Sequence, residues 1–302
     1  MNVGSRARVW LLTLIWGGWS GWFPVVGRSA EPAPPDKPVL LYSRYYNAEG
    51  ETRYLPDGTF KEILRKLSEH FTVRIHRERL TAAVLDDVSV LLIANPSDQP
   101  VGSNPPPPHM SLQDARLLVR YLSQGGGMIL TANQENHNLE VQGMNILMVR
   151  LGLQFTNLYT DAKQLLIPPE TPIVGGLKWG YYTGNLILVR DGYPARPRAL
   201  ITNDLSVKPI KGTRDQAGTL LATAEPGFGR VVVITDTGFI TDDALSGKGI
   251  GEVAIREQDN AEIFLRLARW AGHVPVNSST GEANQKLLLR LRRSLPRSYI
   301  SP

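Results

Sequence analysis

The sequence predicts an α/β fold, with a doubly wound, mainly parallel sheet that carries an antiparallel β insertion. Residues 231–234 are four consecutive β-branched apolar residues, which is typical of a strand buried on both faces. The segment 259–272 then places its apolar residues on one face of a helix. Strand-like and helix-like segments follow the order β, α, β, β, α, β, insertion, β, α. This order favours a parallel sheet that is covered on both faces.

The N-terminal residues 1–27 resemble a signal peptide or an N-terminal membrane anchor. Arg6 and Arg8 form a basic start, residues 9–26 are largely apolar, and small residues at 25–27 offer a cleavage point. The apolar stretch is also just long enough to span a bilayer. Both interpretations place the domain outside the cytoplasm, so we expect an exported protein, periplasmic or extracellular, that a retained segment would anchor to the membrane. Residues 28–37 form a Pro-rich linker.

The domain is expected to span residues 38–273 and to begin with alternating strands and helices. Residues 38–43, 72–76 and 88–93 are predicted strands. A helix is expected over 57–71, with Thr59 and Glu62 as a capping box, and a shorter one over 80–85. Four prolines at 105–108 predict an extended surface loop over 95–109.

The second half of the domain alternates less regularly. Ser111 and Asp114 are placed to cap a helix that ends at the glycines 125–127, and a strand over 128–130 leads to a helix over 141–151. Short β-like runs at 164–167, 186–189, 199–201 and 219–222, separated by Gly and Pro turns, predict the antiparallel insertion. Residues 274–302 form a basic C-terminal tail, which is either solvated or able to rest on an anionic membrane.

Composition excludes several classes of function. The chain has no cysteine, so disulfides, thiolate metal sites and a Cys nucleophile are excluded. The formal net charge is +5, but the basic residues that produce this excess lie in the first 30 residues and in the C-terminal tail. The intervening domain is mildly acidic, which argues against nucleic acid as a partner.

Three segments resemble the class I glutamine amidotransferase-like superfamily. They are the glycines 125–127 followed by MILTAN (128–133), the segment TPIVGGL (171–177), and GRVVVITDTGF (229–239) followed by the helix over 259–272. Within that superfamily the chain is more similar to the non-amidotransferase branch, which contains ThuA-like proteins and the domains of gliding-motility transporter components. The likeness covers residues 38–272 and implies a flavodoxin-like sandwich.

The resemblance implies no activity that this chain can perform. Active amidotransferases carry a Cys nucleophile on the turn after a central strand, where this chain has residues 131–134 and no Cys. A GxSxG elbow is also missing, and a Thr131 nucleophile would need His137 as an adjacent base. We therefore expect a domain without catalytic residues.

Polar residues at the ends of the predicted parallel strands are the candidate ligand-binding residues. Ligands of open α/β sheets bind at the carboxyl edge of the strands. Asp236 is the first choice, because it follows the most apolar strand, and we expect hydrogen bonds to stabilise its carboxylate. The candidates are Ser43, Asn95, Asn133, Glu135, His137, Asp236 and Thr237.

Three hypotheses about function remain open at this stage. The first is an exported, non-catalytic domain that binds a small molecule, such as a carbohydrate, or a protein partner at the strand edge. Tyrosines 42, 45, 46 and 54 near that edge are able to stack on a sugar, or simply pack under a loop. No cofactor and no metal ion are predicted for this domain.

The second hypothesis is a carboxylate- or metal-dependent hydrolase of a carbohydrate-like substrate. Its candidate Ca²⁺ or Mg²⁺ ligands are Asp236, Asp242, Asp243 and Asp259, with Glu135 and His137. Asp242 and Asp259 are equally suited to capping helices. The third hypothesis is a membrane-tethered assembly component whose linker and tail matter most.

Overall fold

The computed structural model describes residues 37–133, 137–160, 162, 164–205, 217–247 and 258–274. The predicted signal or anchor segment, nearly all of the linker and nearly all of the basic tail lie outside these residues. Within the described ranges, no helix has both the length and the apolar character needed to cross a membrane.

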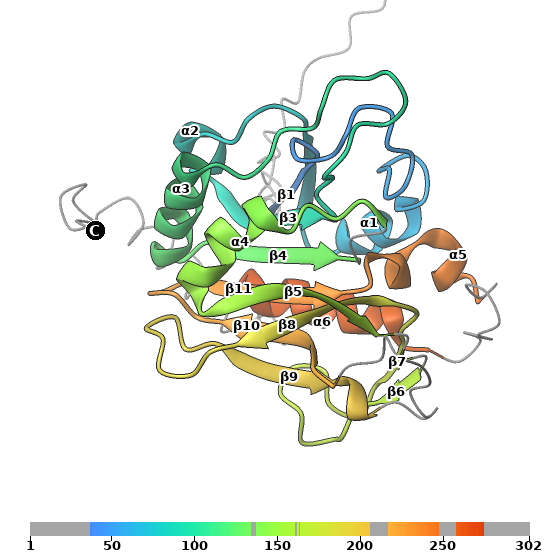
Figure 1. Cartoon of the computed structure of the whole chain (residues 1–302). Helices are drawn as coiled ribbons and strands as arrows, with labels where there is room; N and C mark the ends of the chain where they lie inside the picture. The colour runs from blue at the N-terminus through green and yellow to red at the C-terminus, as the bar shows by residue number, and fades with distance from the viewer. Residues whose placement is uncertain are drawn as a thin grey trace, which may run out of the picture. The chain divides into compact units, whose positions relative to one another are not determined.

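The first half of the domain alternates strands and helices as predicted (Figure 1). Its elements are β1 (Val39–Ser43), α1 (Lys61–Leu67), β2 (Thr72–His76), α2 (Ala82–Leu85), β3 (Val88–Ala94), α3 (Leu112–Ser123), β4 (Gly127–Ala132) and α4 (Gln142–Met148). The predicted helix over 141–151 is α4 followed by a 3₁₀ turn (Val149–Leu151).

The second half contributes mainly short strands before the last parallel strand. They are β5 (Leu153–Thr160), β6 (Gln164–Leu166), β7 (Lys178–Gly180), β8 (Gly184–Val189), β9 (Arg198–Thr202) and β10 (Thr219–Ala224). A 3₁₀ turn (Asn203–Leu205) follows β9. The chain then forms β11 (Arg230–Thr235), a 3₁₀ turn (Thr237–Ile240), α5 (Asp242–Leu245) and α6 (Asn260–Ala271).

The sheet topology confirms the predicted fold class. Nine of the described strands form one sheet in the order β2-β1-β3-β4-β11-β10-β8-β5, with β9 paired to β10, and β6 pairs with β7 in a separate two-stranded sheet. The pairs β1–β2, β1–β3, β3–β4 and β4–β11 are parallel. The strands β10, β8, β5 and β9 are antiparallel to their neighbours and extend the same sheet. The result is a flavodoxin-like parallel half joined to an antiparallel extension.

The central strand β11 is buried on both faces, as its sequence predicts. Val232 and Ile234 pack into one hydrophobic core together with residues of α1 and α6. Val231 and Val233 pack into a second core together with residues of α2, α3 and α4. All four side chains have 0% exposure, which confirms that helices cover both faces of the sheet.

Glycine is required where β4 begins. A Cβ on Gly127 would lie 2.3 Å from the carbonyl oxygen of Ala271, at the end of α6. The preceding helix α3 begins with the expected capping box, in which the Ser111 hydroxyl and the Asp114 backbone N–H form a hydrogen bond. The glycine run therefore lets α3 end and β4 start in close contact with α6.

The beginning of α1 differs from its prediction. The helix starts at Lys61, and the expected capping box of Thr59 and Glu62 is wrong because Thr59 accepts a hydrogen bond from the Tyr54 backbone N–H instead. The Glu62 backbone N–H donates to Asp242 Oδ1 at 2.8 Å. The first turn of α1 is thus capped from α5, a partner 180 residues away in the sequence.

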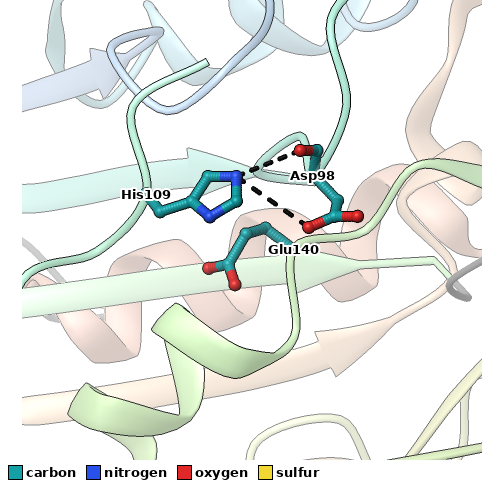
Figure 2. A group of neighbouring side chains, drawn as sticks. All are labelled: Asp98, His109 and Glu140. Atoms are coloured by element: carbon teal, nitrogen blue, oxygen red, sulfur yellow. Dashed lines mark hydrogen bonds and ion pairs between the residues drawn. The ribbon is translucent and has the colours of Figure 1, made fainter. Parts of the chain in front are cut away.

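The loops that follow β3 and β4 pair with each other through a bridge between Ser97 and Leu139. The Glu140 backbone N–H donates to the Pro96 carbonyl at 2.8 Å, so the two loops are fixed side by side. Figure 2 shows that this pairing brings the side chains of Asp98 and Glu140 close to His109.

Candidate functional site

The carboxyl ends of four parallel strands meet at one edge of the sheet. Ser43 ends β1, while Asn95, Asn133 and Asp236 directly follow β3, β4 and β11. These strands are neighbours in the sheet, so the four residues lie along a single row. They are buried, with exposures of 0%, 1%, 6% and 2% respectively.

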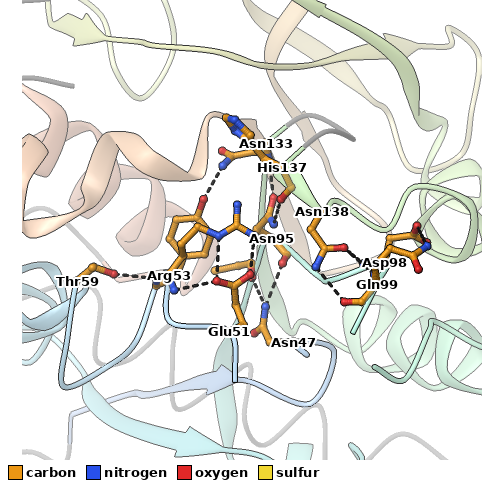
Figure 3. A network of polar contacts seen from close by, with 12 residues as sticks. Asn47, Glu51, Arg53, Thr59, Asn95, Asp98, Gln99, Asn133, His137 and Asn138 are labelled. Carbon is orange, nitrogen blue, oxygen red and sulfur yellow. Dashed lines mark hydrogen bonds and ion pairs between the residues drawn. The ribbon is translucent and has the colours of Figure 1, made fainter. Parts of the chain in front are cut away.

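Asn133 is the centre of a buried hydrogen-bond network at this edge (Figure 3). Its Oδ1 accepts from the Thr237 backbone N–H at 2.7 Å, and its Nδ2 donates to the Tyr54 hydroxyl. Its backbone N–H donates to Asn95 Oδ1 at 2.8 Å, and its carbonyl accepts from the Asn185 N–H at 3.1 Å. One residue therefore joins β4 to the ends of β3 and β11 and to the loop before α1.

Asp236 lies in the left-handed region, with φ of 66°, immediately after β11. Its Oδ2 accepts a hydrogen bond of 2.7 Å from the Tyr182 backbone N–H. Gly184 allows this approach, because a Cβ there would lie 2.6 Å from the Asp236 backbone nitrogen. The carboxylate is stabilised by hydrogen bonding as expected, although the donor belongs to the loop before β8 and not to a helix.

Asn95 and His137 are joined by a backbone contact. Asn95, at φ of 40°, donates from Nδ2 to the His137 carbonyl at 3.3 Å. Asn47 supports the same turn by donating at 3.0 Å to the carbonyls of Ala94 and Asn95. Glu135, the remaining candidate, lies outside the described residues. The ligand-binding role of the seven candidates stays a prediction.

Tyr54 reaches the edge from the loop between β1 and α1. Its carbonyl accepts from the Tyr42 hydroxyl at 2.7 Å and from Arg44 Nη1 at 2.8 Å. Burial raises the pKa of Tyr42 to about 12, and burial also raises the pKa of Tyr54, with a further rise from the nearby Asp236 charge. Tyr42, Tyr46 and Tyr54 are therefore buried packing residues, and Tyr45 is the half-buried one.

An ion pair fixes the same loop. Arg53 donates to both carboxylate oxygens of Glu51, at 2.9 Å and 2.5 Å. Partial burial favours a higher pKa for Glu51, but hydrogen bonds from the Arg53 side chain and backbone outweigh it and hold the pKa below its ordinary value of 4.5. Glu51 is therefore ionised near neutral pH and holds the loop in place.

A cavity of about 650 Å³ adjoins the network over the carboxyl ends of β1 and β2. Its lining comprises Arg44, Tyr45, residues 47–52, Leu55, Arg77 and the prolines 105–108. The wall is tied to the network because Arg44 binds the Tyr54 carbonyl and Asn47 binds the Asn95 carbonyl. Sequence reasoning missed this cavity, although Arg44 and Arg77 directly follow two predicted strands.

Some polar atoms beside the network keep unused hydrogen-bonding capacity. In the described part of the chain, the hydroxyls of Thr131 and Thr237 and Nδ2 of Asn185 are buried without a hydrogen-bond partner. Buried polar atoms of this kind usually bind a water molecule or a ligand. All three residues are 0% exposed, and none of them lines the cavity.

Two of the carboxylates considered as Ca²⁺ or Mg²⁺ ligands, Asp242 and Asp259, form structural hydrogen bonds with backbone N–H groups. Asp242 caps α1, and Asp259 accepts from the Lys178 backbone N–H at 2.8 Å, which joins α6 to β7. Neither carboxylate caps its own helix. Among the described residues, the group with metal-ligand spacing is a different one, comprising Asp98, His109 and Glu140.

Comparison with known proteins agrees with the fold. No protein-family model and no curated protein matches this sequence. The mmIFT52 N-terminal domain has a similar structure, with a TM-score of 0.58 and 14% identity over 79% of this chain and 99% of that one. At this identity the similarity shows the fold alone.

Two further matches have TM-scores below 0.5 and carry no argument about activity. A putative ThuA-like protein from Bacteroides uniformis has a TM-score of 0.47 and 12% identity, covering 84% of this chain and 95% of that one. A cytoplasmic protein from Salmonella typhimurium has a TM-score of 0.48 and 12% identity, covering 77% and 98%. ThuA-like proteins are thus among the structural neighbours at low identity.

Proposed function

We propose that this chain is an exported, non-catalytic binding domain that holds a carbohydrate in the cavity beside the strand ends. The observation that carries the proposal is the link between the open cavity and the buried network. The residues at the strand ends bind one another, while the adjoining 650 Å³ cavity has polar walls fixed by the same hydrogen bonds. A preformed wall lowers the entropic cost of binding.

The absence of turnover is supported by the chemistry of the edge. The chain has no Cys, and the Thr131 hydroxyl has no described residue within hydrogen-bonding distance to act as its base. The Asp236 carboxylate accepts a backbone N–H, and so do those of Asp242 and Asp259. These carboxylates already have structural partners and come from separate places in the fold, as capping and bridging groups do.

The lining of the cavity suits a polar ligand with an apolar face. Tyr45 is half-buried, and its ring lies edge-on to Tyr46 with centroids 5.0 Å apart. Arg44 and Arg77 supply donors, and Glu49 supplies an acceptor. A small number of polar groups beside an aromatic ring is the usual construction of a sugar-binding pocket.

The proposed export and membrane attachment are supported by the sequence alone. The basic and then apolar pattern of residues 1–27 supports passage through a membrane, with either cleavage or retention as an anchor. The basic tail supports a second contact with an anionic membrane. Both segments lie outside the described residues.

The test is a thermal-shift screen of mono- and oligosaccharides against the wild-type chain, Arg77→Ala and Arg120→Ala. Arg120 is an exposed residue of α3 outside the cavity lining and serves as the matched control. We expect at least one saccharide to raise the Tm of the wild type and of Arg120→Ala, and to lose most of that effect with Arg77→Ala. If no saccharide raises the Tm, the carbohydrate assignment is wrong.

A parallel screen tests whether the domain is catalytic. Wild type and Asp236→Asn are incubated with glycosidase, esterase and amidase substrates, and circular dichroism verifies that the variant is folded. We expect no turnover from either protein. Turnover by wild type that disappears in folded Asp236→Asn would establish an enzyme and contradict the proposal.

A further inference from the structure

Three side chains with metal-binding chemistry meet beside the strand edge, outside the hydrogen-bond network around Asn133. Asp98 follows β3, His109 follows the proline run, and Glu140 precedes α4. One potential ligand atom from each lies within 4.8 Å of the other two. They come from three separate segments of the chain, so their proximity is a product of the fold and not of sequence spacing.

Backbone contacts hold the two loops together and fix the Glu140 carboxylate. The bridge between Ser97 and Leu139 pairs the two loops, and the Asp98 N–H donates to Asn138 Oδ1 at 3.1 Å. Glu140 accepts from the Gly143 N–H at 2.5 Å and, through its other oxygen, from the Met144 N–H at 2.8 Å. Each carboxylate oxygen of Glu140 accepts one N–H and keeps a second lone pair for a cation, while Asp98 Oδ2 accepts from Gln99 Nε2 at 2.6 Å.

The orientation of His109 favours metal binding. Its Nε2 is the ring nitrogen that faces Asp98, 3.0 Å from the Asp98 carbonyl oxygen and 3.9 Å from Oδ1 (Figure 2). In the tautomer that carries its hydrogen on Nδ1, Nε2 directs its lone pair toward Asp98 and can bind an ion there.

The charge of the group also calls for a cation. Asp98 and Glu140 are two carboxylates, and in the part of the chain that the structure describes neither forms an ion pair with Lys or Arg. Glu140 is only 1% exposed. Buried charges are normally paired or coordinate a metal ion. The two N–H donors from the start of α4 offset part of the charge on Glu140, and a bound cation would offset more of it.

We propose that Asp98, His109 and Glu140 bind a divalent transition-metal ion, with Zn²⁺ as the representative. Two carboxylate oxygens and one imidazole nitrogen form a donor set that suits Zn²⁺ better than Ca²⁺ or Mg²⁺, which prefer oxygen ligands alone. The prolines 105–108 line the cavity and lead directly into His109. The ion would therefore fix that wall of the cavity to the loops after β3 and β4.

The experiment is a calorimetric titration of ZnCl₂ into the full chain after treatment with EDTA and its removal. His109→Ala is compared with His70→Ala, a matched substitution outside the group. His109 has a side chain 45% exposed, so its replacement is compatible with folding. Asp98→Asn serves as a second ligand variant, and CaCl₂ and MgCl₂ are titrated in parallel.

We expect wild type and His70→Ala to bind one Zn²⁺ per chain. His109→Ala should bind it roughly 100-fold more weakly or worse, since loss of an outer-shell partner alone costs about 10- to 100-fold. Zn²⁺ should also raise the Tm of wild type and His70→Ala but not that of His109→Ala. The proposal is overturned if wild type binds no Zn²⁺, if His109→Ala binds it as tightly as His70→Ala, or if Ca²⁺ or Mg²⁺ binds more tightly than Zn²⁺. None of these readouts depends on whether the cavity binds a carbohydrate.

Discussion

Replacing Asn133 with Ala removes the two side-chain hydrogen bonds at the centre of the strand-edge network. The Thr237 backbone N–H loses its acceptor and the Tyr54 hydroxyl loses its donor. Both partners are buried, with exposures of 0% for Thr237 and 3% for Tyr54. Each buried polar group left without a partner costs about 1–3 kcal/mol, so the two groups together predict a loss of about 2–6 kcal/mol in the free energy of unfolding.

Urea unfolding monitored by circular dichroism measures this loss, with wild type and Asn104→Ala as references. Asn104 makes one exposed hydrogen bond of 2.9 Å, to the Glu49 carbonyl, so its replacement should cost no more than about 1 kcal/mol. If Asn133→Ala were as mild as Asn104→Ala, the network would not stabilise the strand edge and the reasoning would be refuted.

Three further substitutions test the sheet, the strand edge and the loop. Val233→Asp buries an unpaired charge in β11 and should cost several kcal/mol, on the order of other buried charges, so recovery of a soluble variant with the wild-type Tm would contradict the parallel-sheet assignment. Gly184→Ala brings a Cβ to within 2.6 Å of the Asp236 backbone nitrogen and should cost about 1–3 kcal/mol by overpacking, measured as a fall in the urea midpoint. Glu51→Gln tests the lowered pKa of Glu51. The ionised Glu51 carboxylate stabilises the fold fully above its ordinary pKa of 4.5, and this stabilisation is lost as the pH falls through the lower pKa that Glu51 has in the folded protein. The stability difference between wild type and Glu51→Gln should therefore shrink on acidification below that pH, and a constant difference across the range would show that the ion pair does not titrate as argued.

The parallel half of the fold can be predicted from the sequence, because a strand buried on both faces needs apolar residues at consecutive positions. Residues 231–234 must be apolar at every position, since alternate side chains of β11 enter different cores. Ser111 and Asp114 form their predicted capping box because both partners lie within one helical turn. Local patterns of this kind depend on few distant contacts.

The candidate site depends on distant contacts, and sequence reasoning reached it only in part. The polar residues after each strand predicted the row of Asn95, Asn133 and Asp236, because parallel strands end at a common edge. Nothing local indicates that Tyr54 would reach Asn133, a partner 79 residues away. Asp242 likewise caps α1 across 180 residues, while Thr59, the predicted cap, binds the Tyr54 N–H instead.

The same limit explains the cavity and the metal-binding group. Both are formed where the loops after neighbouring strands pack together, so their members come from separate segments of the sequence. Spacing rules detect ligand sets that lie within one helix or one loop. A set such as Asp98, His109 and Glu140 becomes visible only when the strand order is known.

Hydrogen exchange of the backbone amides, measured with and without a saccharide that raises the Tm, tests the central claim most directly. The claim is that the strand edge is a closed, supporting network and that the adjoining cavity takes the ligand. The amides of Asn133 and Thr237 should be protected before ligand is added, because they already donate to buried acceptors. The account predicts that added protection appears in residues 44–55, which contribute much of the cavity wall, and leaves Asn133 and Thr237 unchanged. Ligand-induced protection at Asn133 and Thr237, with residues 44–55 unaffected, would contradict it.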